Sequence, residues 1–332
     1  MNEINFLNVF FTVFSFILLI IPGFVLARTK ILGKGADSVL SSAVLYCFQP
    51  ALMFVSFQKT SFNPEIAVNM LIVAGLSAVI HFAMIGFLSL VFRNKSNDAK
   101  INCLKFASVF SNCGFIGIPF LKSLFDGTPY QGEALIYGAI VIAVFNVITW
   151  TVGIYMMTGD KSQISVRKGL LNPTVICTAL GIALFLILKT PVVELAEQGS
   201  NLDSFLTKVM GVCNYLAESV TPISMIVVGI RLSEISFKKL FVDGMAYVSA
   251  LNKLVIMSII SIVVVAFLPV SETIKYVLFF LHSMPSASST VLFAVNFGGD
   301  SDSATVFVLL STILSVASLP LMFLLFKFSI GL

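Results

Sequence analysis

Two short stretches of this chain combine polar side chains, glycines and prolines within apolar surroundings. The first reads Ser111-Asn112-Cys113-Gly114-Phe115-Ile116-Gly117-Ile118-Pro119, and the second reads Ser283-Met284-Pro285-Ser286-Ala287-Ser288-Ser289-Thr290. Proline removes an internal hydrogen bond from a helix, and glycine lets the backbone open without a side-chain penalty. We therefore predict that each stretch breaks a helix and frees backbone groups that protein, water or a ligand must satisfy.

The chemistry of these stretches suits a small organic anion. The carboxamide of Asn112 can hydrogen-bond a carboxylate, and the N-terminus of a half-helix at such a break carries partial positive charge. Two simpler interpretations stay open: the prolines only kink their helices, and the polar side chains bond a neighbouring helix or carbonyls of their own helix. The candidate substrate-binding residues are Asn112, Gly114, Ser286, Ser288 and Ser289, together with Asn146 in the next apolar segment.

Four ionisable residues also lie inside apolar segments, where a charge is costly and a functional role is the default expectation. Lys253 could neutralise a bound anion or pair with Glu218, and the alternatives are snorkelling and a purely structural ion pair. His81 and His282 could titrate near neutral pH, although a packed histidine is the simpler reading for each. Lys253, Glu218 and His282 are therefore the candidates for coupling or charge compensation.

Acidic residues are missing from both polar stretches. No Asp or Glu occurs between Cys103 and Leu124 or between Val277 and Phe297, which disfavours a sodium site built on carboxylates, although carbonyls and hydroxyls alone can hold sodium. The five cysteines form no CxxC pair, and no His stands at metal-ligand spacing from them, so no metal site is predicted. We expect no cofactor, and proton and sodium coupling both stay open.

Composition identifies the surroundings of these stretches. With 58% hydrophobic and 11% charged residues, the chain is predicted to be an all-α polytopic membrane protein. Its net charge of +4 comes without a basic cluster interleaved with aromatics, so a nucleic-acid partner is not expected. Runs long enough to cross about 30 Å of hydrocarbon, roughly 20 residues each, cover 6–27, 37–57, 66–92, 101–125, 133–157, 169–188, 205–231, 241–268, 273–297 and 304–328.

The chain also repeats itself at half its length. The segment that starts at Pro50 is echoed 172 residues later from Pro222, and Ser283 follows Asn112 by 171 residues. Because each half holds an odd number of spans, five, the second half must enter the membrane from the opposite side. We predict two inverted repeats, residues 1–158 and 159–332, with the broken fourth and ninth helices crossing. Matched interruptions in two halves are typical of transporters that bind substrate near the bilayer midplane.

Basic residues predict the orientation of the chain. The first, third, fifth and seventh connections between spans hold thirteen Lys and Arg residues, whereas the second, fourth, sixth and eighth hold five. By the positive-inside rule, both termini lie outside the cytoplasm. We expect a multi-pass protein of the plasma or inner cell membrane. Asn172 before Pro173 is a helix N-cap signal and predicts that the sixth helix starts there.

Several short motifs, in order, resemble the auxin efflux carrier family over nearly the whole chain. They are Pro50-Ala51-Leu52-Met53-Phe54, Asn112 followed by Gly117-Ile118-Pro119, Asn172-Pro173, Met225 to Gly229, Met284-Pro285 and Ser318-Leu319-Pro320. Bacterial members of that family include proteins assigned as malate and malonate permeases, and the family's fold is similar to that of the bile acid:sodium symporters.

The resemblance implies an elevator-type carrier. Helices 1, 2, 6 and 7 would form a scaffold, helices 3–5 and 8–10 a moving transport domain, and Asn112, Pro119, Asn146 and Pro285 would line the substrate site. A homodimer through the scaffold is a further expectation. Only residues 158–168 join the halves here, unlike the long loop of plant members, so the plant hormone is not implied as substrate.

These observations together predict a secondary active or facilitative transporter of a small organic anion, malate-like, malonate-like or other, and not an enzyme. A sodium-coupled symporter of the bile-acid type is one alternative, and a membrane receptor that binds its ligand without moving it is another. A third is an intramembrane protease, suggested by Gly298-Gly299-Asp300, but no second membrane-embedded aspartate is available to form a dyad.

Overall fold

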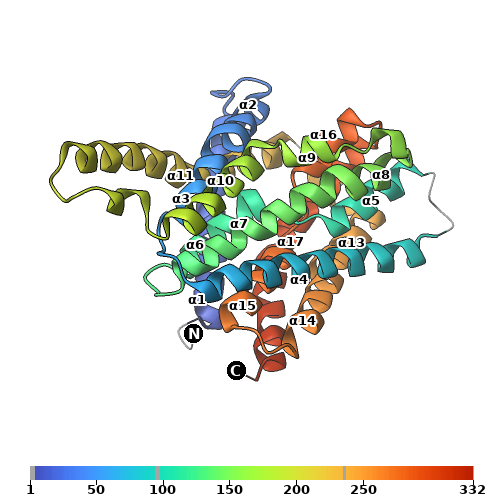
Figure 1. The fold of residues 1–332 in the computed structure, drawn as a ribbon. Coiled ribbons are helices and arrows are strands. Elements are labelled where there is room, and N and C mark those ends of the chain that lie inside the picture. Colours follow the sequence, from blue (N-terminus) through green and yellow to red (C-terminus); the bar gives the residue numbers. More distant parts are fainter. Residues whose placement is uncertain (1–3, 94–97, 235–236, 332) are drawn as a thin grey trace.

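The computed structural model describes residues 4–93, 98–234 and 237–331, and leaves out the side chains of 237–239. Among the lysines counted for orientation, Lys95 and the side chains of Lys238 and Lys239 therefore lie outside the described residues. Figure 1 shows a molecule built from helices. Within the described part of the chain, the only extended pairing is an isolated antiparallel bridge between Ser111 and Ser286.

Among the described residues, eight helices are long and apolar enough to cross a membrane. Several of them contain a short π-helical turn, so one continuous helix carries two α labels, one on each side of the turn. The eight are α1 (Phe6–Arg28), α2 to α3 (Ala36–Phe57), α4 (Pro64–Val91), α7 to α8 (Gln131–Thr158), α10 (Pro173–Leu188), α11 (Asn201–Glu234), α13 to α14 (Gly244–Ala266) and α17 (Ser301–Ser329).

Two further apolar segments are interrupted, at the predicted places. The first runs as α5 (Ala99–Val109) and, after a break, as η2 and α6 (Cys113–Leu124). The second runs as α15 (Glu272–Ser283) and, after a break, as α16 (Ser289–Asn296). The same order therefore occurs in both halves of the chain: three long helices, one broken segment and one long helix. The remaining described helices are short: η4 (Lys161–Gln163), α9 (Val166–Leu170), η5 (Val192–Leu195) and α12 (Phe237–Val242).

The ends of the elements follow local sequence signals. Asn172 caps α10, its side chain accepting a hydrogen bond from the Thr174 N–H, and Pro173 occupies the first turn as predicted. The expected span 169–188 was therefore too long at its start, because residues up to Leu170 belong to the separate helix α9. Both termini lie at the same end of the molecule (Figure 1), where the Lys327 ammonium donates to the Ile4 carbonyl.

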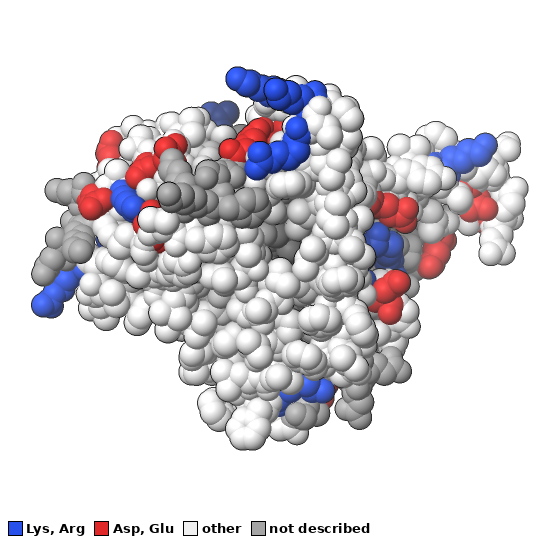
Figure 2. Space-filling view, turned by 180° about the vertical axis from the view of Figure 1, so that it is seen from behind, with Lys and Arg blue, Asp and Glu red and all other residues white. Residues whose placement is uncertain are grey.

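The surface suits a bilayer. Large apolar side chains are exposed on most long helices, as on α1, where Phe11 is 58% exposed and Phe14 48%. Figure 2 shows charged residues towards the edges of one face, with a broad uncharged area between them. A continuous apolar surface of this kind is unfavourable in water and favourable in lipid.

Helices α1 and α11 approach each other closely through two glycines. A Cβ atom added at Gly23 would collide with the Ile226 carbonyl, and one added at Gly229 would collide with the backbone of α1 at Ile20 and Phe24. Since small residues let backbones approach in membranes, this contact fixes the pairing of the two helices.

We expect Gly229→Leu to lower the melting temperature of the purified protein by about 5 °C or more, because the side chain has only backbone atoms to displace. Gly211→Leu on the same helix is the matched control, since a Cβ atom there meets open space. Equal melting temperatures for the two variants would show that α1 and α11 do not pack in this way.

Candidate functional site

The two helix breaks meet and satisfy each other's backbone. The Asn112 N–H donates to the Pro285 carbonyl at 2.7 Å, and the Ala287 N–H donates to the Phe110 carbonyl at 2.8 Å. Backbone groups released by a break in a membrane helix need such partners, because lipid offers none. The pairing of 110–112 with 285–287 thus makes two open segments into one crossing.

The second half-helices begin directly at this crossing. One starts at Cys113 and the other at Ser289. The amides of a first helical turn have no acceptor within their own helix, and the helix dipole adds partial positive charge there. Two sources of positive potential therefore converge without a cationic side chain.

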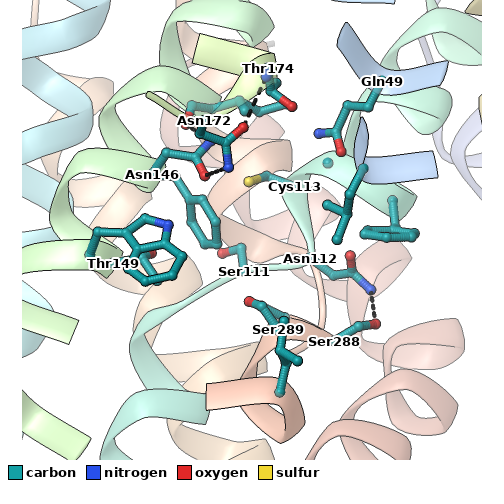
Figure 3. A pocket seen from close by; sticks show the side chains of 18 of the residues that line it. Gln49, Ser111, Asn112, Cys113, Asn146, Thr149, Asn172, Thr174, Ser288 and Ser289 are labelled. Carbon is teal, nitrogen blue, oxygen red and sulfur yellow. Dashed lines mark hydrogen bonds between the residues drawn. The ribbon is translucent and has the colours of Figure 1, made fainter. Parts of the chain in front are cut away.

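A cavity lies beside these N-termini (Figure 3) and contains about 760 Å³ of empty space, counting the part open to its surroundings. Five of the predicted site residues line it: Asn112, Gly114, Asn146, Ser288 and Ser289. The wall also contains polar residues that sequence reasoning did not assign to a site, namely Gln49, Ser111, Thr149, Asn172 and Thr174, and the aromatic residues Tyr46, Phe115, Phe145, Trp150 and Phe293.

Two hydrogen bonds donated by asparagine side chains lie along the wall, as Figure 3 shows. Asn112 Nδ2 donates to Ser288 Oγ at 3.2 Å, which joins the two half-helix starts. Asn172 Nδ2 donates to Asn146 Oδ1 at 3.3 Å, while Asn146 Nδ2 donates to the Ile142 carbonyl at 2.9 Å. Asn172 therefore both caps α10 and fixes the orientation of Asn146.

Three polar atoms on the wall lack a partner. Gln49 Oε1, Thr149 Oγ1 and Ser289 Oγ are buried and have no hydrogen bond within the described part of the chain. Leaving a buried polar atom unsatisfied costs about 1–3 kcal/mol, so native interiors rarely contain several together. Other described residues away from the cavity also have such atoms, but these three leave the cavity wall with hydrogen-bonding capacity that the protein itself does not use.

The cavity carries no formal charge. Among the described residues that line it, none is Asp, Glu, Lys, Arg or His. Polar recognition there depends on amides, hydroxyls and half-helix N-termini, and the rest of the wall is apolar. Such a wall fits a molecule with one polar end and an apolar body.

Three predicted site residues do not line this cavity. Pro119 is buried in the first turn of α6. The Pro285 carbonyl accepts a hydrogen bond from the Asn112 N–H. Pro285 also lines a different, largely apolar cavity next to α1 and α17. Ser286 donates its backbone N–H to Ser311 Oγ at 3.1 Å. Since alternate residues of an extended segment point to opposite sides, the 284–288 segment cannot present all its side chains to one cavity.

The ionisable candidates are separated from one another. Lys253 is completely buried beneath the crossing, whereas Glu218 is exposed on α11, so the suggested pair between them does not form. His282 is also buried. Its Nδ1 contacts the Leu278 carbonyl at 2.8 Å and its Nε2 contacts Ser77 Oγ at 3.2 Å. None of the three lines the cavity.

Asp300, the basis of the protease alternative, has a local structural role. It is the N-cap of α17 and accepts hydrogen bonds from the Ser303 N–H at 2.9 Å and Ser303 Oγ at 2.6 Å. Partial burial acts to raise the pKa of Asp300, but these hydrogen bonds outweigh it and the net shift is downward. Asp300 therefore stays charged and caps the helix.

The fold and the crossing define a multi-pass membrane transporter. Consistent with this, the chain matches the family model described as membrane transport protein over residues 8–323, and it belongs to that family. It is similar to an uncharacterized transporter of Methanothermobacter thermautotrophicus, with 24% identity over 315 residues that cover 93% of this chain and 96% of the relative. The family resemblance drawn from the sequence motifs is thereby confirmed.

Proposed function

We propose that the protein is a secondary carrier that binds a small organic anion in the cavity at the helix crossing. The observation that supports this most is the pair of unpartnered hydroxyls, Thr149 Oγ1 and Ser289 Oγ, which can donate to an anion and lie beside two half-helix N-termini. A carboxylate offers several acceptor lone pairs for amide and hydroxyl donors. Asn112 and the first-turn amides would bind it.

The preferred substrate in this proposal is a monocarboxylate with an apolar or aromatic body. A dicarboxylate such as malate or malonate would bring a second charge against Trp150, Phe145 and Phe293, where the wall offers no cation. Burying an uncompensated charge is far more costly than burying an apolar group. Dicarboxylates are therefore the second choice.

Alternating access would come from movement of one part of the protein past another. The proposed scaffold comprises α1, α2 to α3, α10 and α11, and the proposed transport domain comprises the two broken segments with α4, α7 to α8, α13 to α14 and α17. The close packing of α1 on α11 supports the first group. The bridge between the two breaks supports the second. We further propose that residues 1–158 and 159–332 are inverted repeats, which the repeated order of helices supports.

The remaining features of the proposal concern the protein's surroundings. The cell membrane as location, with both termini outside the cytoplasm, is supported by the distribution of basic residues. A homodimer through the scaffold is supported by the start of α11, which projects from the body (Figure 1) and exposes apolar side chains such as Phe205 and Val212.

Counterflow in proteoliposomes tests the function. We expect labelled monocarboxylates with apolar bodies to exchange at least about tenfold faster than dicarboxylates of similar size, because one buried uncompensated charge costs more than 1.4 kcal/mol. Exchange of dicarboxylates alone would contradict the substrate class. Binding without exchange would favour the receptor alternative, and exchange that needs sodium at a fixed proton gradient would favour the sodium symporter.

A further inference from the structure

The Lys253 ammonium lies at the crossing and does not itself line the substrate cavity, although its partner Ser111 does. Lys253 belongs to the π-turn η6 (Asn252–Ile256) between α13 and α14, and its side chain is completely buried. Its Nζ donates to the Val109 carbonyl at 3.4 Å, to the His282 carbonyl at 3.0 Å and to Ser111 Oγ. These three oxygens come from both broken segments.

The acceptors are the negative ends of two half-helices. Val109 is the last residue of α5, and His282 is the last but one of α15. Carbonyls in a last helical turn have no donor within their helix and carry the negative end of the helix dipole. An ammonium has three N–H donors, and three oxygens receive them here. Ser111 completes the set by donating its own hydroxyl to the His282 carbonyl at 3.0 Å.

No carboxylate takes part in this arrangement. The described hydrogen-bond partners of Lys253 are two carbonyls and one hydroxyl. A buried ammonium without a carboxylate is a costly arrangement unless dipoles replace the missing counter-charge. The two helix C-termini supply those dipoles, and the lysine in turn offsets their mutual repulsion.

We propose that Lys253 is a tethered cation that fastens the two broken helices at their C-terminal ends, in the place where a dissolved monovalent cation could otherwise bind. It is a positioning residue, because it holds the crossing and does not line the cavity. Two consequences follow. Wild-type transport requires no sodium, and removal of the lysine side chain leaves an oxygen-lined site that accepts a small ammonium ion. Only the consequence for transport depends on the proposed function.

Melting temperatures test the tether without relying on any substrate. Lys253→Ala shortens the side chain and leaves room, so methylammonium is expected to raise its melting temperature, whereas the bulkier choline is not. Lys253→Met fills the same space with an uncharged side chain, and methylammonium is expected to leave it unchanged. Lys275→Ala removes a lysine that bonds only the Ala266 carbonyl at a helix end, and it controls for general salt effects.

Proteoliposome exchange tests the same tether in transport. Replacing sodium by choline at fixed pH is expected to leave the wild-type rate unchanged. Lys253→Ala is expected to lose about tenfold or more of its exchange rate, since removing one partner leaves the others buried and unpaired. Methylammonium, at equal concentration on both sides, is expected to recover a large part of that loss in Lys253→Ala and none in Lys253→Met.

Three results would overturn the proposal. One is wild-type transport that falls when choline replaces sodium, because the required cation would then be dissolved. Another is a Lys253→Ala protein whose melting temperature methylammonium does not raise. This holds also if the variant is unfolded without methylammonium and stays unfolded when it is added. The third is a folded Lys253→Met protein with full exchange activity. If wild type transports no tested compound but methylammonium stabilises Lys253→Ala selectively, the tether stands and the proposed function fails.

Discussion

Replacing Asn112 by alanine is expected to abolish substrate exchange while the protein stays folded. The backbone N–H of Asn112, which binds the Pro285 carbonyl, is kept in the variant, so the crossing survives. What is lost is the carboxamide that joins Ser288 across the two half-helix starts and faces the cavity. Sites built on hydrogen bonds lose large factors when one partner disappears, and we expect a decrease of about a hundredfold or more in the exchange rate.

Counterflow of the best monocarboxylate measures this effect, and the melting temperature of the same preparation checks the fold. Asn214→Ala is the matched control, because it removes a carboxamide that bonds only the Met210 carbonyl of its own helix. The control is expected to exchange at the wild-type rate. A folded Asn112→Ala protein with unchanged affinity and rate would remove the crossing from the substrate path.

The broken helices were predictable because their causes are local. Proline and glycine act on the backbone of their own segment, so Pro285 and the glycines around Asn112 mark the breaks in the sequence itself. The same holds for Asn172, whose side chain caps the helix that starts one residue later. The two breaks also lie at equivalent positions in the two halves of the chain, where Ser283 follows Asn112 by 171 residues, which indicated that the broken helices form one crossing.

The composition of the cavity wall was less predictable, because it depends on which faces of distant helices meet. Gln49 precedes the Pro50 motif by one residue, yet nothing local shows that its amide faces Gly114 across the structure. Trp150 comes four residues after Asn146, one helical turn on, and shares its face. That spacing was a usable signal. Asn172 carries a local signal for a helix cap, but nothing local shows that its amide reaches Asn146 on another helix.

Hydropathy predicts how deep a residue lies along a membrane span, but it does not predict which side of the helix its side chain occupies. Hydropathy placed Lys253 and Glu218 inside apolar segments, which suggested a pair. The structure exposes Glu218 on the surface of α11 and buries Lys253 among helix C-termini. A carboxylate is therefore not the only counter-charge to expect for a membrane lysine when broken helices are nearby.

Gly114→Leu is expected to stop transport by a different route, because it occupies the boundary between the proposed scaffold and transport domain. A Cβ atom at Gly114 would collide with the side chain of Gln49 on α3, and both residues line the cavity. A leucine must therefore push Gln49 aside and fill the space next to the half-helix N-terminus. Overpacking costs about 1–3 kcal/mol in a packed interior, and here it also removes volume from the site.

We expect the exchange rate of Gly114→Leu to fall about a hundredfold or more, while its melting temperature changes by only a few degrees. Gly86→Leu on α4 is the matched control, since a Cβ atom there meets open space. Gly114→Ala should lie between the two, because Gln49 is a flexible side chain that can yield to a methyl group. Full exchange by Gly114→Leu would mean that substrate passes without touching this face of the crossing.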